Sequence, residues 1–307
     1  MRPQEYALPI MARVGPHVNR YHAAGARSSM AAHVEAARLQ AETDGGFEIR
    51  AVSLFVGGPQ QRVINLRPEE RGELREYLSR TGIRAIAHSA YVASPWKGDP
   101  DAARFIRDEL DVCVEAGIEG LVVHLPKLPV TQVMRYIPRL LSPAAVNVRL
   151  YLEIPAIPKG SFYESPEKLV FLFNQIRSTI DPDLARFGLC VDTAHLWTCG
   201  VDVSSYEAAS RWLDRLEQSA EVIPHSSIML HLNDSAQERG RGPDTHAPLM
   251  RGKIWESYEN NVEESGLAAF LDYASRHETS VILERKPKEA LLGDYHILRE
   301  LMPAAHL

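Results

Sequence analysis

The stretch HLNDSAQERGRGPDTH, residues 231–246, carries at its two ends the kinds of side chain that bind divalent metal ions. His231 lies in an apolar run, SIMLHLND, that is typical of a buried strand, whereas Asp244 and His246 follow a loop of Gly, Arg and Pro. We therefore expect the loop to return a carboxylate and a second imidazole to the end of the strand. Nitrogen and oxygen ligands without sulfur suit Zn²⁺, Mn²⁺ or Fe²⁺, and the share of histidine favours zinc.

Further residues of the same types stand at or near the carboxyl ends of other predicted strands: His88, His124, Glu153, Asp192, His195 and Glu284. In a parallel barrel those ends meet on one face, where barrel enzymes carry out their chemistry. The full set of five histidines and four carboxylates is too large for one tetrahedral ion and sufficient for two or three. Three divalent cations would leave the site positive and attractive to phosphate. The set therefore predicts hydrolysis of a phosphodiester by water that the metal ions activate.

Each of these residues also has a simpler interpretation. A histidine at a strand end, such as His88 or His124, is more often a hydrogen-bonded interior side chain than a metal ligand. The DTAH segment could be a helix cap with a surface histidine, and GRGPDTH could be a plain turn. Glu153 and Glu284 are harder to explain in this way, because a carboxylate that ends an apolar strand is costly to bury without a cation. The other histidines are predicted to lie outside the site: His17, which ends the first strand, and His22, His33, His225, His277, His296 and His306.

The elements that must position these residues repeat along the whole chain. Apolar, β-branched runs alternate with helical patterns, which predicts a single (β/α)₈ TIM barrel domain over residues 1–307. Helices are most clearly marked at 99–117, with an acidic start and a final glycine, and at 165–180, which begins Ser-Pro-Glu. An open doubly wound sheet is the alternative, but no GxGxxG turn follows any strand. The predicted strands are 9–18, 48–56, 83–91, 121–126, 148–156, 187–195, 227–234 and 280–286.

Composition limits the class of protein. With 307 residues, 45% hydrophobic and 24% charged, the chain has the balance of a soluble globular protein. No apolar run approaches the ~20 residues of a membrane span, and the first residues lack a secretory signal, so we expect an intracellular protein. The three cysteines are far apart and form no CxxC, so neither a disulfide framework nor a thiolate zinc site is suggested. The net charge of -6 argues against a generally basic nucleic-acid coat, although bound cations and local arginines still attract phosphate. We expect a monomer, because no long apolar surface stripe stands out.

Taken together, the motifs resemble those of the endonuclease IV apurinic/apyrimidinic (AP) endonucleases, which are (β/α)₈ barrels with three zinc ions. FGLCVDTAHLWTCGVDV is similar to the DTCH segment of that family, and HLNDSAQERGRGPDTH to its HLNDS…DRH segment. Shorter matches pair RVGPHV with GAHVS, HSAY with HxxY, LVVHLP with HPG, YLEIPA with ENTAG and VILERK with LET. The resemblance thus spans nearly the whole chain.

The resemblance implies hydrolysis of the DNA phosphodiester 5′ to an abasic site, and trimming of blocked 3′ ends, in base excision repair. A hydroxide that bridges two ions would be the nucleophile, with Glu153 shared by those ions and Glu284 orienting the hydroxide. The implied partner is double-stranded DNA that contains an abasic site. The implied ligand sets are His88, His124 and Glu153 for one zinc, Glu153, Asp192, His231 and Glu284 for the second, and His195, Asp244 and His246 for the third, with Mn²⁺ or Fe²⁺ as an alternative at one site.

The resemblance also points to DNA contacts. Tyr91 matches a tyrosine that enters the duplex at the lesion, and Val92 matches the apolar residue after it; an ordinary rim aromatic is the alternative for Tyr91. Four cations near the metal-bearing loop could contact DNA phosphates or could simply be solvated: Arg239, Arg241, Arg251 and Lys253. The chain departs from the family beside these residues: LVVHLPKL lacks the glycine of HPG, and FVGGPQQRV does not clearly supply the family's arginine wedge.

Two other functions remain open from the sequence. Sugar isomerases and epimerases of the xylose-isomerase-like barrels use a single metal on a set such as Glu153, Asp192, His231 and Glu284. Such an enzyme would not need the carboxylate and imidazole of the GRGPDTH loop. A DNA- or ligand-binding protein without catalysis is disfavoured, because no expected ligand is missing.

Overall fold

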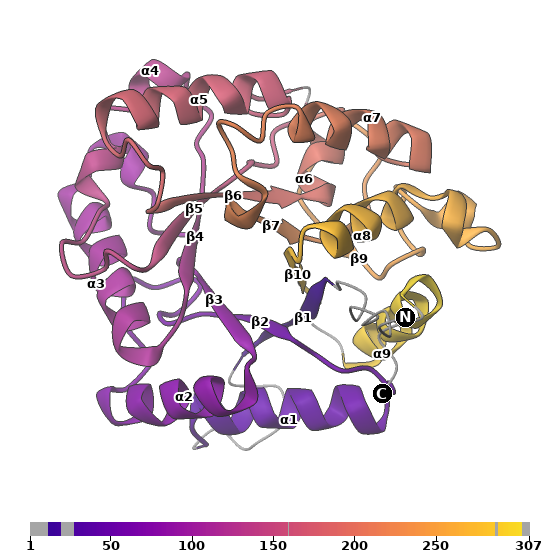
Figure 1. Cartoon of the computed structure of the whole chain (residues 1–307), viewed down its shortest axis with the longest axis horizontal. Coiled ribbons are helices and arrows are strands. Elements are labelled where there is room, and N and C mark those ends of the chain that lie inside the picture. The colour runs from indigo at the N-terminus through magenta and orange to yellow at the C-terminus, as the bar shows by residue number, and fades with distance from the viewer. Residues whose placement is uncertain (1–11, 20–27, 159, 286–287, 303–307) are drawn as a thin grey trace, which may run out of the picture.

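Eight parallel strands close into a barrel, in the spatial order β1-β10-β7-β6-β5-β4-β3-β2 (Figure 1). The computed structural model describes residues 12–19, 28–158, 160–285 and 288–302. The predicted closed barrel is confirmed, and the open sheet is excluded. The barrel strands are β1 (Arg13–Val18), β2 (Ala51–Leu54), β3 (Arg84–His88), β4 (Gly120–His124), β5 (Arg149–Glu153), β6 (Phe187–Asp192), β7 (Ile228–His231) and β10 (Ser280–Leu283).

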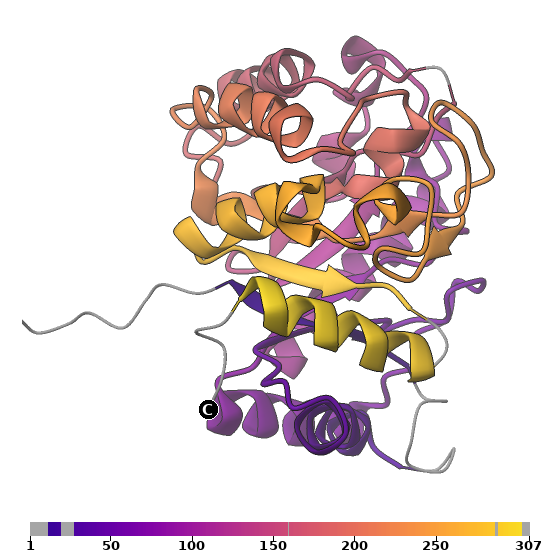
Figure 2. The same cartoon turned by 90° about the vertical axis from the view of Figure 1, so that its right-hand side faces the viewer.

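Helices surround the barrel, and Figure 2 views the side on which the last elements, α8, β10 and α9, lie. None of the helices in the described ranges combines the length and the apolar character that a membrane span requires. The α-helices are α1 (Met30–Thr43), α2 (Pro68–Thr81), α3 (Pro100–Ala116), α4 (Val130–Val133), α5 (Pro166–Thr179), α6 (Thr193–Thr198), α7 (Tyr206–Glu217), α8 (Gly266–Arg276) and α9 (Lys288–Leu301). Short 3₁₀ turns are η1 (Pro95–Lys97), η2 (Ile137–Arg139), η3 (His225–Ser227), η4 (Glu256–Tyr258) and η5 (Val262–Glu264).

The two helices marked most clearly in the sequence begin and end close to the predicted residues. The side chain of Asp99 accepts hydrogen bonds from the backbone N–H groups at the start of α3. Gly117 ends this helix with φ 70°, a left-handed conformation that glycine adopts without strain. Ser165 precedes α5 as expected, but its side chain makes no capping hydrogen bond, and Pro166 begins the helix instead.

The strands end earlier than the apolar pattern predicts. The prediction 83–91 ends at His88, and the prediction 187–195 ends at Asp192. The second difference arises because Asp192 Oδ1 accepts a hydrogen bond from His195 N at 2.9 Å and so begins α6. Ligand-type residues end five of the eight barrel strands, β3 to β7. Residues 9–11 and 286 of the predicted first and last strands lie outside the described residues.

The interior of the barrel is packed with side chains and is not a channel. Tyr151, the largest member of the inner cluster, fits because glycines face it from both neighbouring strands. A Cβ added to Gly120 would lie 2.4 Å from Tyr151 Cε2, and one added to Gly188 would lie 2.5 Å from its Cδ1. Because these side chains fill the interior of the barrel, the open face is the one at the carboxyl ends of the strands. The inner cluster consists of Ala51, Ile86, Val122, Tyr151, Cys190, Met229 and Ile282.

Candidate metal centre

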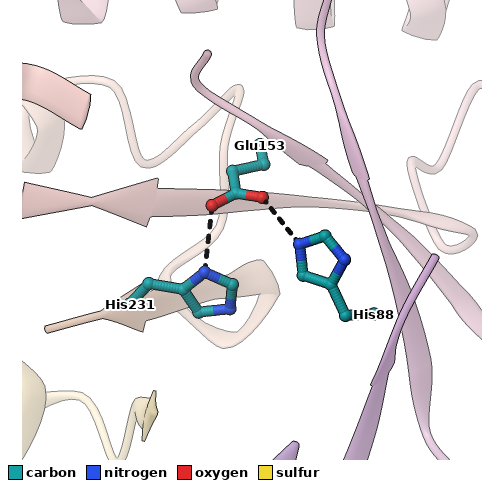
Figure 3. Close-up of side chains that lie close together, drawn as sticks. All are labelled: His88, Glu153 and His231. Atoms are coloured by element: carbon teal, nitrogen blue, oxygen red, sulfur yellow. Dashed lines mark hydrogen bonds and ion pairs between the residues drawn. The ribbon is translucent and has the colours of Figure 1, made fainter. Parts of the chain in front are cut away.

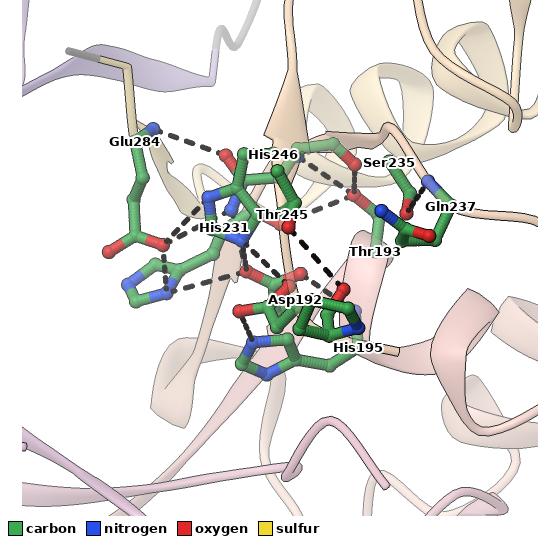
Figure 4. A network of polar contacts seen from close by, with 12 residues as sticks. Asp192, Thr193, His195, His231, Ser235, Gln237, Thr245, His246 and Glu284 are labelled. Atoms are coloured by element: carbon green, nitrogen blue, oxygen red, sulfur yellow. Dashed lines mark hydrogen bonds and ion pairs between the residues drawn. The ribbon is translucent and has the colours of Figure 1, made fainter. Parts of the chain in front are cut away.

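The loop after β7 folds back on itself through a small antiparallel ladder. β8 (Asp234–Ser235) pairs with β9 (His246–Ala247), so that Ser235 lies opposite His246. Ala236 N extends the ladder by donating to Thr245 O at 2.9 Å. The loop therefore returns to the end of β7 as predicted, because its two ends pair through backbone hydrogen bonds. His246 therefore lies 3.8 Å from both Asp192 Oδ2 and Glu284 Oε2, the two oxygens that His231 also approaches (Figure 4).

Glu153, at the end of β5, lies at the centre of the ligand-type residues and is fully buried (Figure 3). Its Oε2 lies 2.8 Å from His124 Nε2 and 3.2 Å from His88 Nε2. Its Oε1 lies 2.9 Å from His231 Nδ1. One carboxylate thus contacts imidazoles from β3, β4 and β7, three strands that are separate in the sequence and adjacent to or near β5 in the barrel.

A second part of the centre joins the ends of β6 and β10 (Figure 4). Asn233 Nδ2 donates to Asp192 Oδ2 at 2.6 Å and to Glu284 Oε2 at 3.2 Å. Glu284 Oε2 also lies 3.5 Å from His231 Nδ1, and this distance links the second part to Glu153. The amide of Asn233 therefore holds two carboxylates that would otherwise repel each other.

The returned loop supplies the third part. Asp244 Oδ2 lies 3.0 Å from His195 Nε2, and Asp244 Oδ1 lies 3.3 Å from His246 Nε2. His195 is buried in α6, so the alternative of a surface histidine after a helix cap is wrong for this residue. Asp192 does cap the helix, but it does so with Oδ1 alone while Oδ2 faces the centre.

Two of the imidazoles are oriented by backbone carbonyls. His88 Nδ1 lies 2.8 Å from Ser89 O, and His195 Nδ1 lies 2.7 Å from Ile154 O. A carbonyl oxygen only accepts, so in both rings Nδ1 carries the proton and donates. Nε2 is then the ring nitrogen that faces the carboxylates, and it is the atom that would give its lone pair to a metal ion in place of a proton.

The carboxylates and imidazoles shift one another's pKa. Burial raises the pKa of Glu153, but the charges of His124 and His231 outweigh burial and hold it well below its usual range. Burial likewise raises the pKa of Glu284, and His231 and His246 lower it to about 2. Burial raises the pKa of Asp192. The protein alone thus balances buried carboxylates with protonated imidazoles, and a divalent cation would supply the same balance.

The donor set fits divalent cations in number and kind. Three compact groups have ligand atoms within 4.8 Å of one another: His88 with Glu153 and His231, Asp192 with His195 and His246, and Asp192 with His231 and Glu284. These groups contain seven of the nine predicted ligands, and the other two, His124 and Asp244, contact Glu153 and His195. All nine offer nitrogen or oxygen, as zinc accepts. The groups do not divide the ligands as the resemblance implies, because His231 also lies with His88 and Glu153, and Asp192 also lies with His195 and His246. The division among individual ions stays a prediction.

The next residues are the histidines that the sequence predicts to lie outside the metal centre. His22 and His306 lie outside the described residues. His17 ends β1 with its ring 4.6 Å from that of Phe55, and it belongs to none of the three groups found among the described residues.

Tyr91 and Val92 lie at the rim of the centre. Tyr91 is 57% exposed, and its ring centroid lies 5.4 Å from that of His88 and 5.8 Å from that of His124. Arg62 secures this rim by donating through Nε and Nη2 to Val92 O. Its Nη1 pairs with Asp99 Oδ2 at 2.6 Å, so this arginine of the FVGGPQQRV loop is tied to the neighbouring loop.

Most of the cations predicted to contact phosphate already have acidic partners. Arg239 also lies over the ring of Trp197, with 5.8 Å from its Cζ to the ring centroid. Arg241 forms no ion pair with a residue of the described ranges. The pairs are Arg239 with Asp202 at 2.7 Å, Arg251 with Glu259 at 2.6 Å and Lys253 with Glu256 at 2.7 Å.

A buried network that the sequence analysis missed orients Asn233. Arg285 Nη1 donates to Asn233 Oδ1 at 2.7 Å, and Arg285 Nε pairs with Asp294 of α9 at 2.9 Å. Because Oδ1 of the amide is occupied by this donor, Nδ2 must face the two carboxylates. The available signal was the charged residue that directly follows Glu284 at the end of an apolar strand.

Comparisons with known proteins agree with this architecture. Residues 45–294 match the xylose isomerase-like TIM barrel family. A probable AP endonuclease of African swine fever virus (isolate Tick/South Africa/Pretoriuskop Pr4/1996) is 38% identical over 269 residues, which cover 84% of this chain and 88% of the relative. A probable endonuclease 4 of Natronomonas pharaonis is 25% identical over 284 residues, 90% of this chain and 96% of that relative.

Solved structures that resemble this chain include an endonuclease IV and other xylose isomerase-like barrels. The crystal structure of AsfvAP:AG has a TM-score of 0.89 at 33% identity and covers 95% of this chain and 99% of its own. Endonuclease IV from Thermus thermophilus has a TM-score of 0.72 at 25% identity with the same coverage, 95% and 99%. L-ribulose 3-epimerase, at 15% identity and a TM-score of 0.57 over 96% of this chain and 92% of its own, is similar in fold alone.

Proposed function

Because this chain belongs to the xylose isomerase-like TIM barrel family, as a divergent relative of the endonuclease IV enzymes, we propose that it is an AP endonuclease. The reaction is hydrolysis of the DNA phosphodiester 5′ to an abasic site, and the same chemistry removes blocking groups from 3′ ends in base excision repair. The observation that carries the proposal is the convergence of nine nitrogen and oxygen donors around Glu153, Asp192 and Asp244 at the open end of the barrel.

Three zinc ions are the proposed cofactors, with Mn²⁺ or Fe²⁺ as an alternative at one position. Bound divalent cations lower the pKa of water and neutralise the charge of a phosphodiester. The residues that would hold them are His88, His124, Glu153, Asp192, His195, His231, Asp244, His246 and Glu284.

The chain's own side chains prepare the site in two ways. Ser89 O and Ile154 O hold His88 and His195 with Nε2 toward the centre. Asn233 holds the carboxylates of Asp192 and Glu284 together, which leaves Glu284 Oε1 to orient the attacking water. Such preorganised groups need no rearrangement when the phosphate arrives.

The proposed substrate is double-stranded DNA with an abasic site. We propose that the protein binds it as a monomer, inside the cell, in the cytoplasm. Tyr91 and Val92 have the exposure that an insertion into the duplex requires. A sugar isomerase is not favoured: a single-metal site does not need the Asp244, His195 and His246 contacts of the returned loop, and the likeness to the epimerase is one of fold.

The proposal is tested by incubating the purified protein with a duplex that contains one abasic site, with and without a chelator. We expect incision that leaves a 3′-hydroxyl, loss of incision with the chelator, and recovery when Zn²⁺ is added. An undamaged duplex of the same sequence is the control substrate, and the metal content per chain is measured on the same sample. One ion per chain together with no incision of the abasic duplex would contradict the proposal.

A further inference from the structure

A cleft opens beside the metal centre, between the loops that follow β3 and β4. His88 and His124 form the wall that the cleft shares with the centre. The volume of the cleft, about 300 Å³, is at the lower end of the range for ligand pockets. The cleft is therefore large enough for a short segment of a polymer whose next segment contacts the metal centre.

Two lysines line this cleft, and neither has an acidic partner in the part of the chain that the structure describes. Lys97 ends η1 in the first loop, and Lys127 lies in the second; both are exposed. Within the described ranges neither forms an ion pair or a side-chain hydrogen bond. No Asp or Glu is among the described residues that line the cleft. In a chain with a net charge of -6, an anion in this cleft meets only positive or neutral side chains among the described residues that line it.

The two rims of the cleft are held in place relative to each other. Trp96 Nε1, next to Lys97, donates to His124 O at 2.8 Å and so ties η1 to the end of β4. Trp96 and Leu125 are 4% and 2% exposed and make the deep part of the cleft apolar. A charged rim above an apolar floor matches the alternation of phosphate and deoxyribose in a DNA strand.

Three of the four cations in the segment after β7 are less available to a phosphate, because Arg239, Arg251 and Lys253 form ion pairs; within the described ranges Arg241 forms none. Arg251 and Lys253 would have to leave Glu259 and Glu256 before they could contact one, whereas the cleft lysines have no such pair to break. An exposed ion pair is worth up to about 1 kcal/mol, so the preference for the unpaired lysines is modest at each residue and adds up over several contacts.

We propose that this cleft binds the sugar–phosphate backbone of the strand that is cut, with Lys97 and Lys127 each contacting a phosphate. The inference rests on the proposed function and adds to it the loops that hold the substrate strand. It also differs from the expectation drawn from the sequence, which assigned the backbone contacts to the cations of the loop after β7.

The test uses the metal-loaded protein and a fluorescent duplex with one tetrahydrofuran abasic analogue, in which methylene replaces the bridging 3′ oxygen of the scissile linkage. The dissociation constant is measured over a series of salt concentrations for the wild type, Lys97→Ala, Lys127→Ala and the double variant. Each phosphate contact contributes about 0.9 to the slope of log K against log salt. We expect each single variant to reduce the magnitude of this slope by about 0.9, and the double variant to reduce it by about 1.8.

Lys168→Ala is the matched control, because it removes the same charge from α5, where Lys168 pairs with Glu164 at 2.5 Å. Its slope should equal that of the wild type, and Lys127→Arg should retain the wild-type slope as well. Melting temperatures of all variants check that they fold. If the lysine variants fold and keep the full slope while the wild type incises abasic DNA, this inference is wrong and the proposed function stands. If the wild type neither incises abasic DNA nor prefers the abasic duplex over an undamaged one, the proposed function fails.

Discussion

Glu109 is a buried acid whose ionisation should make the stability of this protein depend on pH in a predictable direction. It lies on α3 and is fully buried beneath the loop that carries Tyr91, where Ser89 Oγ donates to its Oε2 at 2.5 Å. Burial raises the pKa of Glu109 from 4.5 to about 8, against the hydrogen bonds from Ser89 and Ala90. The folded protein therefore keeps this carboxyl protonated at pH 7.

The sign follows from the two pKa values. The unfolded chain loses the proton above pH 4.5, whereas the folded chain keeps it until about pH 8, so this residue lowers the stability progressively as the pH rises between those values. One pKa unit corresponds to about 1.4 kcal/mol, which gives a cost of about 3 kcal/mol at pH 7 and about 1 kcal/mol at pH 5.

Glu109→Gln removes this cost, because the glutamine side chain has the shape of the protonated acid and no charge. We expect the stability advantage of the variant over the wild type to be larger at pH 7 than at pH 5 by about 2 kcal/mol. Urea unfolding at both pH values measures it, and any effect of pH that is common to both proteins cancels in the difference. Glu115→Gln, on the exposed face of the same helix, is the control and should change stability by less than about 1 kcal/mol at either pH. A Glu109→Gln advantage that is the same at pH 5 and pH 7 would refute the assignment of a neutral, buried carboxyl.

Three further predictions concern the centre, the network behind it and the barrel interior. Glu284→Gln should fold normally but slow incision of abasic DNA by several orders of magnitude, and near wild-type turnover would contradict its role. Arg285→Met leaves Asp294 buried without its cation and should cost about 3–5 kcal/mol in urea unfolding, much of which the double variant Arg285→Met/Asp294→Leu should recover. Gly120→Ala places a Cβ 2.4 Å from the ring of Tyr151 and should destabilise by about 1–3 kcal/mol; unchanged stability would show that the barrel interior yields more easily than its packing suggests.

The barrel itself could be predicted because its signals are local. Apolar runs, capping residues and terminal glycines act within a few residues of one another, and Asp99 and Gly117 bound α3 as the sequence indicates. The strand ends were harder, since the apolar pattern continues past the residue at which Asp192 turns the chain into α6. A side chain that caps a helix competes with strand pairing, and pattern alone does not say which of the two prevails.

The sequence by itself determined which donor types stand at the strand ends, and closure of a parallel barrel is enough to bring such ends to one face. Only the tertiary structure decided which basic side chain forms an ion pair with which acidic one. Arg251 and Lys253 are paired, while Lys97 and Lys127 have no acidic partner among the described residues, and the amide of Asn233 is turned by Arg285 toward two carboxylates. These outcomes depend on distances between groups that are far apart along the chain, and those distances are fixed only when the barrel closes and the loops pack against one another.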